Sequence, residues 1–79
     1  MQWLRVITIS YLAPKNNLEA RVKIHDEMEN KSVVFPRSYD KLFDEQAFEY
    51  LQERGIKIEA RGYQHEKIIV MTNDINSIN

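Results

Sequence analysis

The strongest constraint on the fold is a strict alternation of apolar and polar residues over residues 18–25. Leu18, Ala20, Val22 and Ile24 share one face of this segment, and the polar residues between them share the other. A period of two is typical of a strand with one buried and one solvated face, which antiparallel sheets provide. The segment therefore predicts an antiparallel sheet that carries its core on one side.

The rest of the chain divides into segments that fit this sheet. Further strands are predicted over residues 3–12, 31–35, 56–61 and 67–71, where β-branched and aromatic residues concentrate. Between the third and fourth strands lies one helix, with Asp44 as its expected N-cap and Gly55 as the residue that ends it. Its apolar stripe consists of Ala47, Phe48, Tyr50 and Leu51. The fold class is therefore α+β: an antiparallel sheet of about five strands, in the order β-β-β-α-β-β, with one helix on one face.

The length of 79 residues allows one domain. We assign residues 1–72 to it and expect residues 73–79 to form a polar, frayed C-terminal tail. A domain of this size buries only about 60% of the surface of its unfolded chain, so its core is thin. A shallow groove or a flat surface is the binding feature to expect, rather than an enclosed substrate cavity.

The composition narrows the class of function further. The chain has no cysteine, and its 11 Lys and Arg residues against 12 Asp and Glu residues give a net charge of −1. The absence of cysteine excludes disulfides and thiolate metal sites and favours a cytoplasmic protein. The net charge near zero argues against a protein dedicated to binding the phosphate backbone of nucleic acid. Two glycines cannot build a phosphate-binding loop, and no apolar run is long enough for a membrane span. We expect no cofactor, no metal and no membrane partner.

Catalytic patterns are absent from the sequence. His25 and His65 are single histidines at expected solvated positions, and no further ligands lie at the spacing of a metal site. The serines form no nucleophile motif. We therefore predict a protein that is not an enzyme, and keep Glu–His chemistry in a dimer cleft only as a remote alternative.

The charges are segregated, and the helix is acidic. Residues 40–53 contain five acids and one base. Asp44, Glu45, Glu49 and Glu53 are the candidate contacts to a basic partner, because an acidic surface attracts and steers such a partner. The alternative is that this charged row is only the solvated side of the helix.

A second candidate surface is basic. Arg21 and Lys23 share a strand face, and Lys57, Arg61 and Tyr63 belong to the region of the last two strands. If these strands are neighbours, the open face of the sheet carries a basic patch with an aromatic residue, on which nucleic-acid bases could stack. The alternative is an ordinary solvated face of mixed charge.

Part of the sequence resembles a recurring pattern in small uncharacterised proteins of phages, plasmids and bacteria. The matching residues cover about half the chain and are Tyr11-Leu12, Pro14, Asn16, Ala20-Arg21-Val22-Lys23, Lys31-Ser32-Val33, Pro36 and Tyr39. The resemblance implies a mobile-element setting in a bacterial host cell, where small proteins often inhibit host defence, as anti-CRISPR and anti-restriction proteins do. It implies no catalytic residue.

The sequence thus supports one leading hypothesis and one alternative. The leading hypothesis is a small binding protein, acting as a monomer or homodimer, that inhibits a bacterial defence complex by occluding its surface. Its partner would be a protein or a nucleoprotein complex. The alternative is a small accessory protein that binds nucleic acid through a basic sheet face.

Overall fold

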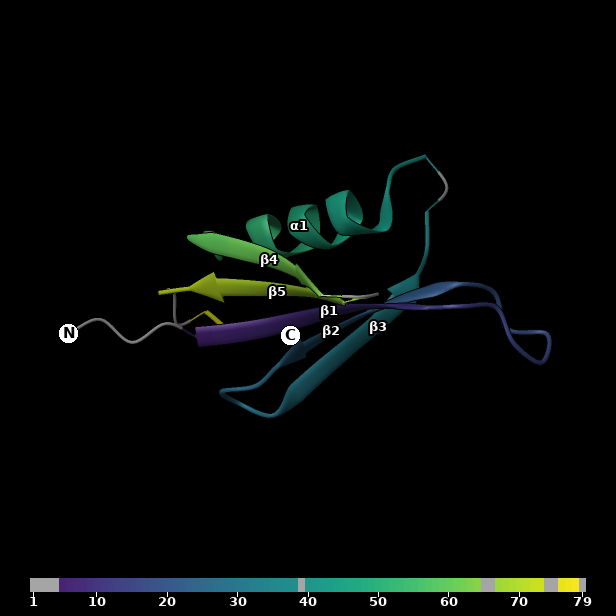
Figure 1. Cartoon of the computed structure of the whole chain (residues 1–79), viewed down its shortest axis with the longest axis horizontal. Helices are drawn as coiled ribbons and strands as arrows, with labels where there is room; N and C mark the ends of the chain where they lie inside the picture. The colour runs from purple at the N-terminus through teal and green to yellow at the C-terminus, as the bar shows by residue number, and fades with distance from the viewer. Residues whose placement is uncertain (1–4, 39, 65–66, 74–75, 79) are drawn as a thin grey trace.

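A computed structural model describes residues 5–38, 40–64, 67–73 and 76–78 of the chain. It contains five strands and one helix (Figure 1). Their bounds are β1 (Arg5–Leu12), β2 (Arg21–Asp26), β3 (Lys31–Pro36), α1 (Phe43–Glu53), β4 (Ala60–Gln64) and β5 (Lys67–Thr72). The predicted α+β fold and the order of its elements are confirmed. In the described part of the chain no helix has the length and hydropathy that a membrane crossing requires.

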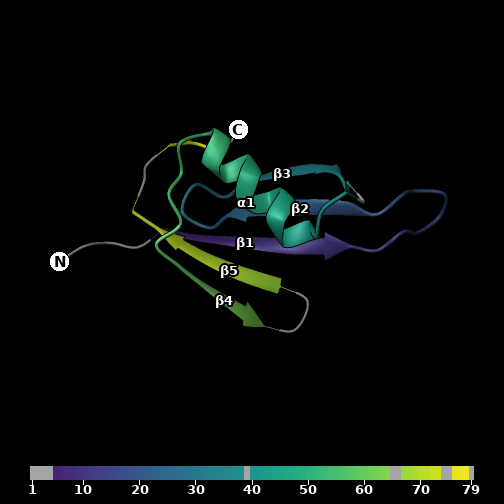
Figure 2. The ribbon, with the colours of Figure 1, turned by 90° about the horizontal axis from the view of Figure 1, so that it is seen from above.

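The strands form one antiparallel sheet in the order β3-β2-β1-β5-β4 (Figure 2). β1 lies at the centre, consistent with its length and its many β-branched residues. Helix α1 lies on one face of the sheet, above β1 and β2, and none of the described residues forms a helix on the other face (Figures 1 and 2). We call the uncovered side the open face. Strands β3 and β4 are the two edges.

The core lies between α1 and the sheet. Ile9 of β1 stands opposite Ile24 of β2 and Ile68 of β5, so their side chains share the helix-facing side. From the helix, Ala47 and Leu51 close this layer, and all five side chains are buried. The alternation of apolar and polar residues is therefore present in the three central strands β2, β1 and β5, in which every second residue is buried over most of the strand.

The alternation fails at Leu18, which is 54% exposed. The chain makes a two-residue turn here: Lys15 and Leu18 exchange backbone hydrogen bonds of 3.1 and 2.9 Å around Asn16 and Asn17. Both asparagines have positive φ, at 50° and 68°, as the tightest hairpin turns require. Leu18 belongs to this turn, so β2 begins at Arg21 rather than at residue 18 as predicted.

The helix ends as predicted. Gly55 has a φ of 77°, its N–H donates to the carbonyl of Gln52, and the Ile56 N–H donates to the carbonyl of Leu51. This pair of bonds is a Schellman motif, in which the glycine tolerates the left-handed conformation and the following apolar residue packs back on the helix. Ile56 is accordingly buried.

Two further predicted boundaries are wrong. The helix starts at Phe43 with Leu42 as its N-cap, so Asp44 lies inside the first turn instead of capping it. The fourth strand spans Ala60–Gln64 instead of residues 56–61. The physical reason is that residues 56–59 are needed to bring the chain from the helix end down to the sheet; the Glu59 N–H makes the first contact, with the carbonyl of Met71.

The C-terminal segment is packed, not frayed, where the structure describes it. Ile78 is completely buried in the core, and its carbonyl accepts a hydrogen bond of 2.7 Å from the Tyr50 hydroxyl. The Asn76 amide donates to the carbonyl of Gly55 at 3.0 Å. The expectation of a frayed tail is therefore wrong for residues 76–78, which complete the core against α1.

Candidate functional site

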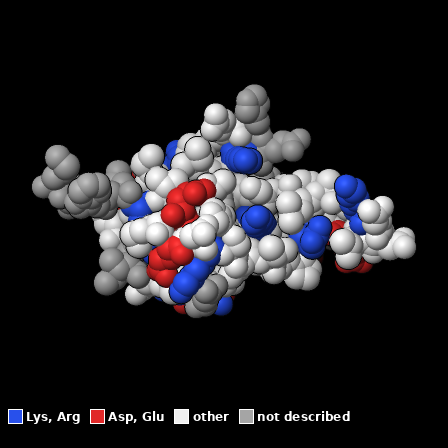
Figure 3. Space-filling model, turned by 90° about the horizontal axis from the view of Figure 1, so that it is seen from below, with Lys and Arg blue, Asp and Glu red and all other residues white. Residues whose placement is uncertain are grey.

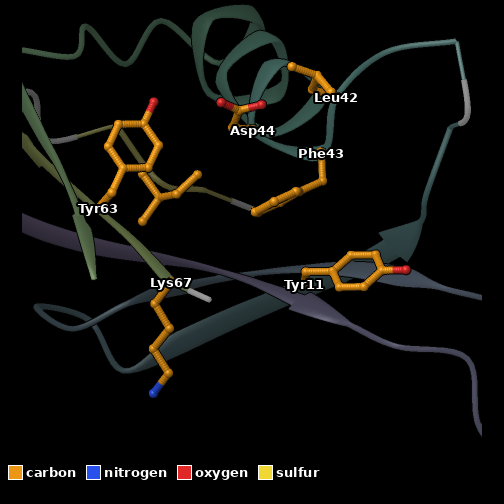
Figure 4. Close-up of a pocket in the computed structure, with 7 residues that line it drawn as sticks. Tyr11, Leu42, Phe43, Asp44, Tyr63 and Lys67 are labelled. Carbon is orange, nitrogen blue, oxygen red and sulfur yellow. The ribbon is translucent and has the colours of Figure 1, made fainter. Parts of the chain in front are cut away.

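A groove of about 440 Å³ lies at one end of the molecule, between the start of α1, the end of β1 and the β4–β5 pair (Figure 4). We call this region the open end. Its lining residues are Tyr11, Leu42, Phe43, Asp44, Tyr63, Lys67 and Ile68. Only the part of Lys67 nearest the backbone lines the groove, because its ammonium group points away from it (Figure 4). The volume is within the usual range for a ligand or anchor-residue pocket.

The walls of the groove are apolar and aromatic. Phe43 packs against Tyr11 with ring centroids 5.6 Å apart and the rings tilted by 44°. Leu42 and Tyr63 face the groove from opposite sides and are 61% and 64% exposed. Helix α1 leaves β4 uncovered, and all five residues of that strand are exposed (Figure 2). Large apolar side chains are thus held in contact with water by the layout of the fold.

Leu42 occupies a position that helices usually give to another residue type. It is the N-cap of α1, with φ −68° and ψ 151°, and its side chain makes no capping hydrogen bond. Its carbonyl accepts the first helical bond from the Gln46 N–H at 3.0 Å. Ser, Thr, Asp or Asn would stabilise this helix start, whereas leucine does not. An exposed leucine here conflicts with local stability, and such conflicts are typical of functional positions.

Acidic side chains begin inside the groove and continue along the helix. The Asp44 carboxylate lies in the groove and accepts a hydrogen bond of 3.0 Å from the Glu45 N–H. Glu45, Glu49 and Glu53 follow on exposed positions of α1. Together with Asp44 they form the acidic helix face, and the prediction that they share one helix is confirmed. Their role as partner contacts stays a prediction.

One lysine partly neutralises this face. The Lys41 ammonium donates a hydrogen bond to the Glu49 carboxylate. This bond is the largest effect and raises the pKa of Lys41 above its ordinary value; burial acts against it, and the charges of Glu49, Glu53 and Asp40 add to the rise. The Lys41 ammonium is thus held beside the carboxylates of the acidic helix face.

The structure separates the predicted basic residues, so the expectation of one basic patch is wrong. Arg21 and Lys23 lie on the open face, because their neighbours Val22 and Ile24 point into the core. Arg61 stands opposite the core residue Val70, which puts Arg61 on the helix-facing side. Tyr63, two residues along, shares that side and lines the groove. Two features cause the separation: β1 and β5 lie between β2 and β4, and the register of β4 turns Arg61 and Tyr63 to the helix-facing side.

Lys57 lies in a third place, in the segment that joins α1 to β4. It is 78% exposed at its side chain and lies 3.9 Å from the Glu59 carboxylate. Its neighbour Ile56 is buried beneath it.

The open face carries its own set of basic residues. Ser10 stands opposite Lys23 on one side and opposite Lys67 on the other, so the two lysines flank the centre of the sheet. Arg21 lies two residues from Lys23 on the same face. Figure 3 shows Lys and Arg side chains spaced along this face, with an acidic group towards the left of the view. The face is mixed in charge rather than uniformly basic.

His25 lies on the open face in an ordinary polar setting. Its Nδ1 is 2.6 Å from the Ser32 hydroxyl, and its Nε2 is 3.7 Å from the Glu27 carboxylate. Among the described residues no three His, Cys, Asp or Glu side chains are grouped as a metal site requires. His65 lies outside the described residues.

The opposite end of the core is sealed by a buried ion pair, and we call it the closed end. The Arg5 guanidinium lies 2.6 Å from the Asp26 carboxylate, and both side chains are almost completely buried. Arg5 also donates to the carbonyl of Asn76 at 2.5 Å, and Asp26 accepts from the Met28 N–H at 3.0 Å. These bonds tie β1, β2 and the C-terminal segment together.

The Arg5–Asp26 pair sets the protonation of its carboxyl group. Burial alone would raise the pKa of Asp26. The hydrogen bond and charge of Arg5, with backbone N–H bonds from Met28 and Glu29, outweigh burial and hold that pKa below its usual 3.8. Asp26 is therefore ionised at neutral pH, and the pair is a structural clamp.

The sequence did not reveal the groove, although one signal was present. Leu42 and Phe43 are two adjacent large apolar residues at the start of a helix, while Tyr63 lies beyond the predicted fourth strand, residues 56–61, and inside the observed β4. These parts come together through the pairing of β5 with β1 and with β4 and through the packing of α1 on the sheet. Comparisons with known proteins add nothing to this geometry: no protein-family model, no curated protein and no solved structure matches the chain.

Proposed function

We propose that this chain is a non-enzymatic protein-binding module that binds a basic partner protein through the open end and the acidic helix face. The observation that carries the proposal is Leu42, an exposed leucine at the N-cap of α1 that walls an aromatic groove. Leucine at this position lowers helix stability and exposes apolar surface. Binding gives a reason for both costs.

The chemistry of the groove defines the partner. Tyr11, Phe43 and Tyr63 offer an apolar pocket for one anchoring side chain, which is how a few residues come to dominate protein interfaces. Asp44 at the groove and the glutamates along α1 favour Lys and Arg around that anchor. The expected partner surface is therefore an aliphatic or aromatic residue surrounded by cations.

A bacterial defence complex fits this description. Complexes that hold nucleic acid present basic surfaces, and an acidic helix beside an apolar anchor could occupy such a surface. The resemblance to small phage and plasmid proteins supports the same proposal: an inhibitor of the anti-CRISPR or anti-restriction kind that acts by occlusion in the bacterial cytoplasm. The small size of the domain is compatible with a role that needs contact and no turnover.

The test is affinity capture from a bacterial lysate with a matched pair of variants. Leu42→Ser removes the groove wall, while Leu18→Ser removes a similarly exposed leucine from the turn before β2. We expect Leu42→Ser to reduce the recovery of specific partners at least about fivefold, as loss of a central anchor does, and Leu18→Ser to leave it unchanged. Quantitative mass spectrometry of the captured proteins measures both.

The contribution of the acidic helix face to binding is tested separately. Replacing Glu45, Glu49 and Glu53 together by Gln keeps the helix and its exposed surface but removes three charges. Capture by this variant should weaken, and capture by the original chain should weaken with added salt in the same way. If both leucine variants capture the same proteins equally well, the open end is not the binding site and the proposal fails.

The open face supports the alternative, a nucleic-acid-binding accessory protein. Lys23 and Lys67 flank Ser10 there, and Arg21 extends the row. Binding of a nucleic-acid pool that falls steeply with salt and is lost in Lys23→Gln, while the lysate yields only background proteins, would favour this alternative over the proposal. A flat salt response would remove it.

A further inference from the structure

Strand β4 is an unprotected edge of the sheet. All five of its residues are exposed, and among the residues that the structure describes no strand pairs with its outer side (Figure 2). The helix lies over the other half of the sheet and does not cover it. A strand edge with free backbone donors and acceptors is a template for another strand.

The other edge is built differently. Strand β3 begins with Lys31 and ends with Pro36, which has no N–H to donate. A charged residue and a proline are the usual devices that keep an edge from pairing. Strand β4 also carries a charged residue, Arg61, but it has no proline, and its centre is Gly62. The two edges therefore differ in the proline, which removes a backbone donor from β3 and not from β4.

We propose that β4 pairs antiparallel with β4 of a second copy of this chain, about a two-fold axis that passes between the two Gly62 residues. In this register Arg61 stands opposite the partner's Tyr63, and Ala60 stands opposite the partner's Gln64. Each contact then occurs twice, as an isologous dimer requires. The two sheets join into one sheet of ten strands with both helices on the same face.

The side chains along the edge are self-complementary. The Arg61 guanidinium lies 5.1 Å from the centroid of the Phe48 ring, beside a hollow of about 290 Å³. The partner's Tyr63, which is largely exposed in the single chain, stands directly opposite Arg61 and covers the outer face of the same guanidinium. Each cation is then held between two aromatic rings, which is a favourable arrangement for arginine.

Gly62 allows a clean test because a side chain fits there in the single chain. A Cβ atom built on Gly62 meets nothing within 4 Å, and its φ lies outside the left-handed region. In the dimer, however, the two side chains at this position are directly opposite each other, about 5 Å apart. Charges of the same sign at this position therefore act on the dimer and not on the fold.

The experiment is sedimentation equilibrium over a range of protein concentrations at low salt. We expect the original chain to dimerise reversibly, and Gly62→Glu and Gly62→Lys to weaken dimerisation about tenfold each. An equimolar mixture of the two variants should form a heterodimer that is tighter than either homodimer. Gly62→Thr, which adds a neutral β-branched side chain, is the matched control and should still dimerise.

Three outcomes would overturn the inference. The original chain could stay monomeric throughout, the charged variants could dimerise as well as the original, or the mixture could stay monomeric although circular dichroism shows both variants folded. Tyr63 takes part in both surfaces, since it walls the groove and faces the partner's Arg61, but the test separates the two proposals because Gly62 stands opposite Ile69 on the open face and does not line the groove. Gly62→Glu can therefore lose dimerisation and still capture partners.

Discussion

The two ends of the core differ in how the apolar layer between α1 and the sheet is bounded. At the closed end it stops at Arg5 and Asp26, which are buried, paired and tied to the C-terminal segment. At the open end it stops at Leu42 and Tyr63, which remain in water around a groove. One end is sealed by polar bonds, and the other is left apolar and exposed.

The difference separates stability from binding. A buried ion pair carries a large penalty if one partner is lost, so the closed end constrains folding. Exposed apolar side chains contribute little to folding, since they gain little burial, but they are available to a partner. Substitutions at the closed end should therefore unfold the chain, and substitutions at the open end should change binding with little loss of stability.

The largest expected effect is at the closed end. Asp26→Asn keeps the shape of the side chain but removes the carboxylate that lies 2.6 Å from the buried Arg5 guanidinium, and the Glu29 carboxylate, at 3.7 Å, is more distant and more exposed. We expect this substitution to lower the free energy of unfolding by about 3–5 kcal/mol, a large share of the stability of a small domain. Urea unfolding followed by circular dichroism measures the change.

The double variant Arg5→Met with Asp26→Leu distinguishes the effect of an unpaired buried charge from the effect of side-chain packing at the closed end. Replacing both charges by apolar groups of similar size should recover most of the lost stability, because no buried charge is left unpaired. A double variant as unstable as Asp26→Asn would mean that the hydrogen bonds to Asn76 and Met28, and not the ion pair, hold this end together.

The same pair predicts how stability depends on pH. The pKa of Asp26 is lower in the folded chain than its ordinary 3.8. The folded state therefore binds fewer protons than the unfolded state in this range, and the contribution of Asp26 is present above pH 3.8 and lost as the pH falls through the folded pKa. We expect the free energy of unfolding to fall below about pH 4. In Asp26→Asn the acid slope should be shallower, and equal slopes would assign the acid sensitivity to other carboxyl groups.

Much of the fold could be predicted from the sequence because its signals are local. The alternation of Val22 and Ile24 with Lys23 survives in the sheet, since β2, like β1 and β5, has one face on the core. Asn16 and Gly55 adopt the left-handed conformations that their residue types suggest. What could not be predicted depends on distant partners: Ile78 is buried only because α1 and the sheet leave a place for it.

The site follows the same division. The acidic helix face was visible because Glu45, Glu49 and Glu53 repeat at the spacing of one helix. The joined basic patch was wrong because it required a strand order and a register of β4 that no local pattern contains. Lys23 and Arg61 end on opposite faces of the sheet. The groove was missed for the same reason, since its walls come from segments that meet only in the folded sheet.

The smallest expected change in the free energy of unfolding is at the open end. Whether this change is stabilising or destabilising tests the contrast between the two ends most directly. Leu42→Ser places a capping hydroxyl at the start of α1, and Glu45, three residues later, completes a capping box. We expect the free energy of unfolding to rise by about 0.5–1 kcal/mol while partner capture falls. Leu18→Ser, the matched loss of an exposed leucine, should change stability by less than about 0.5 kcal/mol. If Leu42→Ser instead destabilises the chain by more than about 1 kcal/mol, Leu42 supports the core, and the open end is a second structural seal and not a surface reserved for binding.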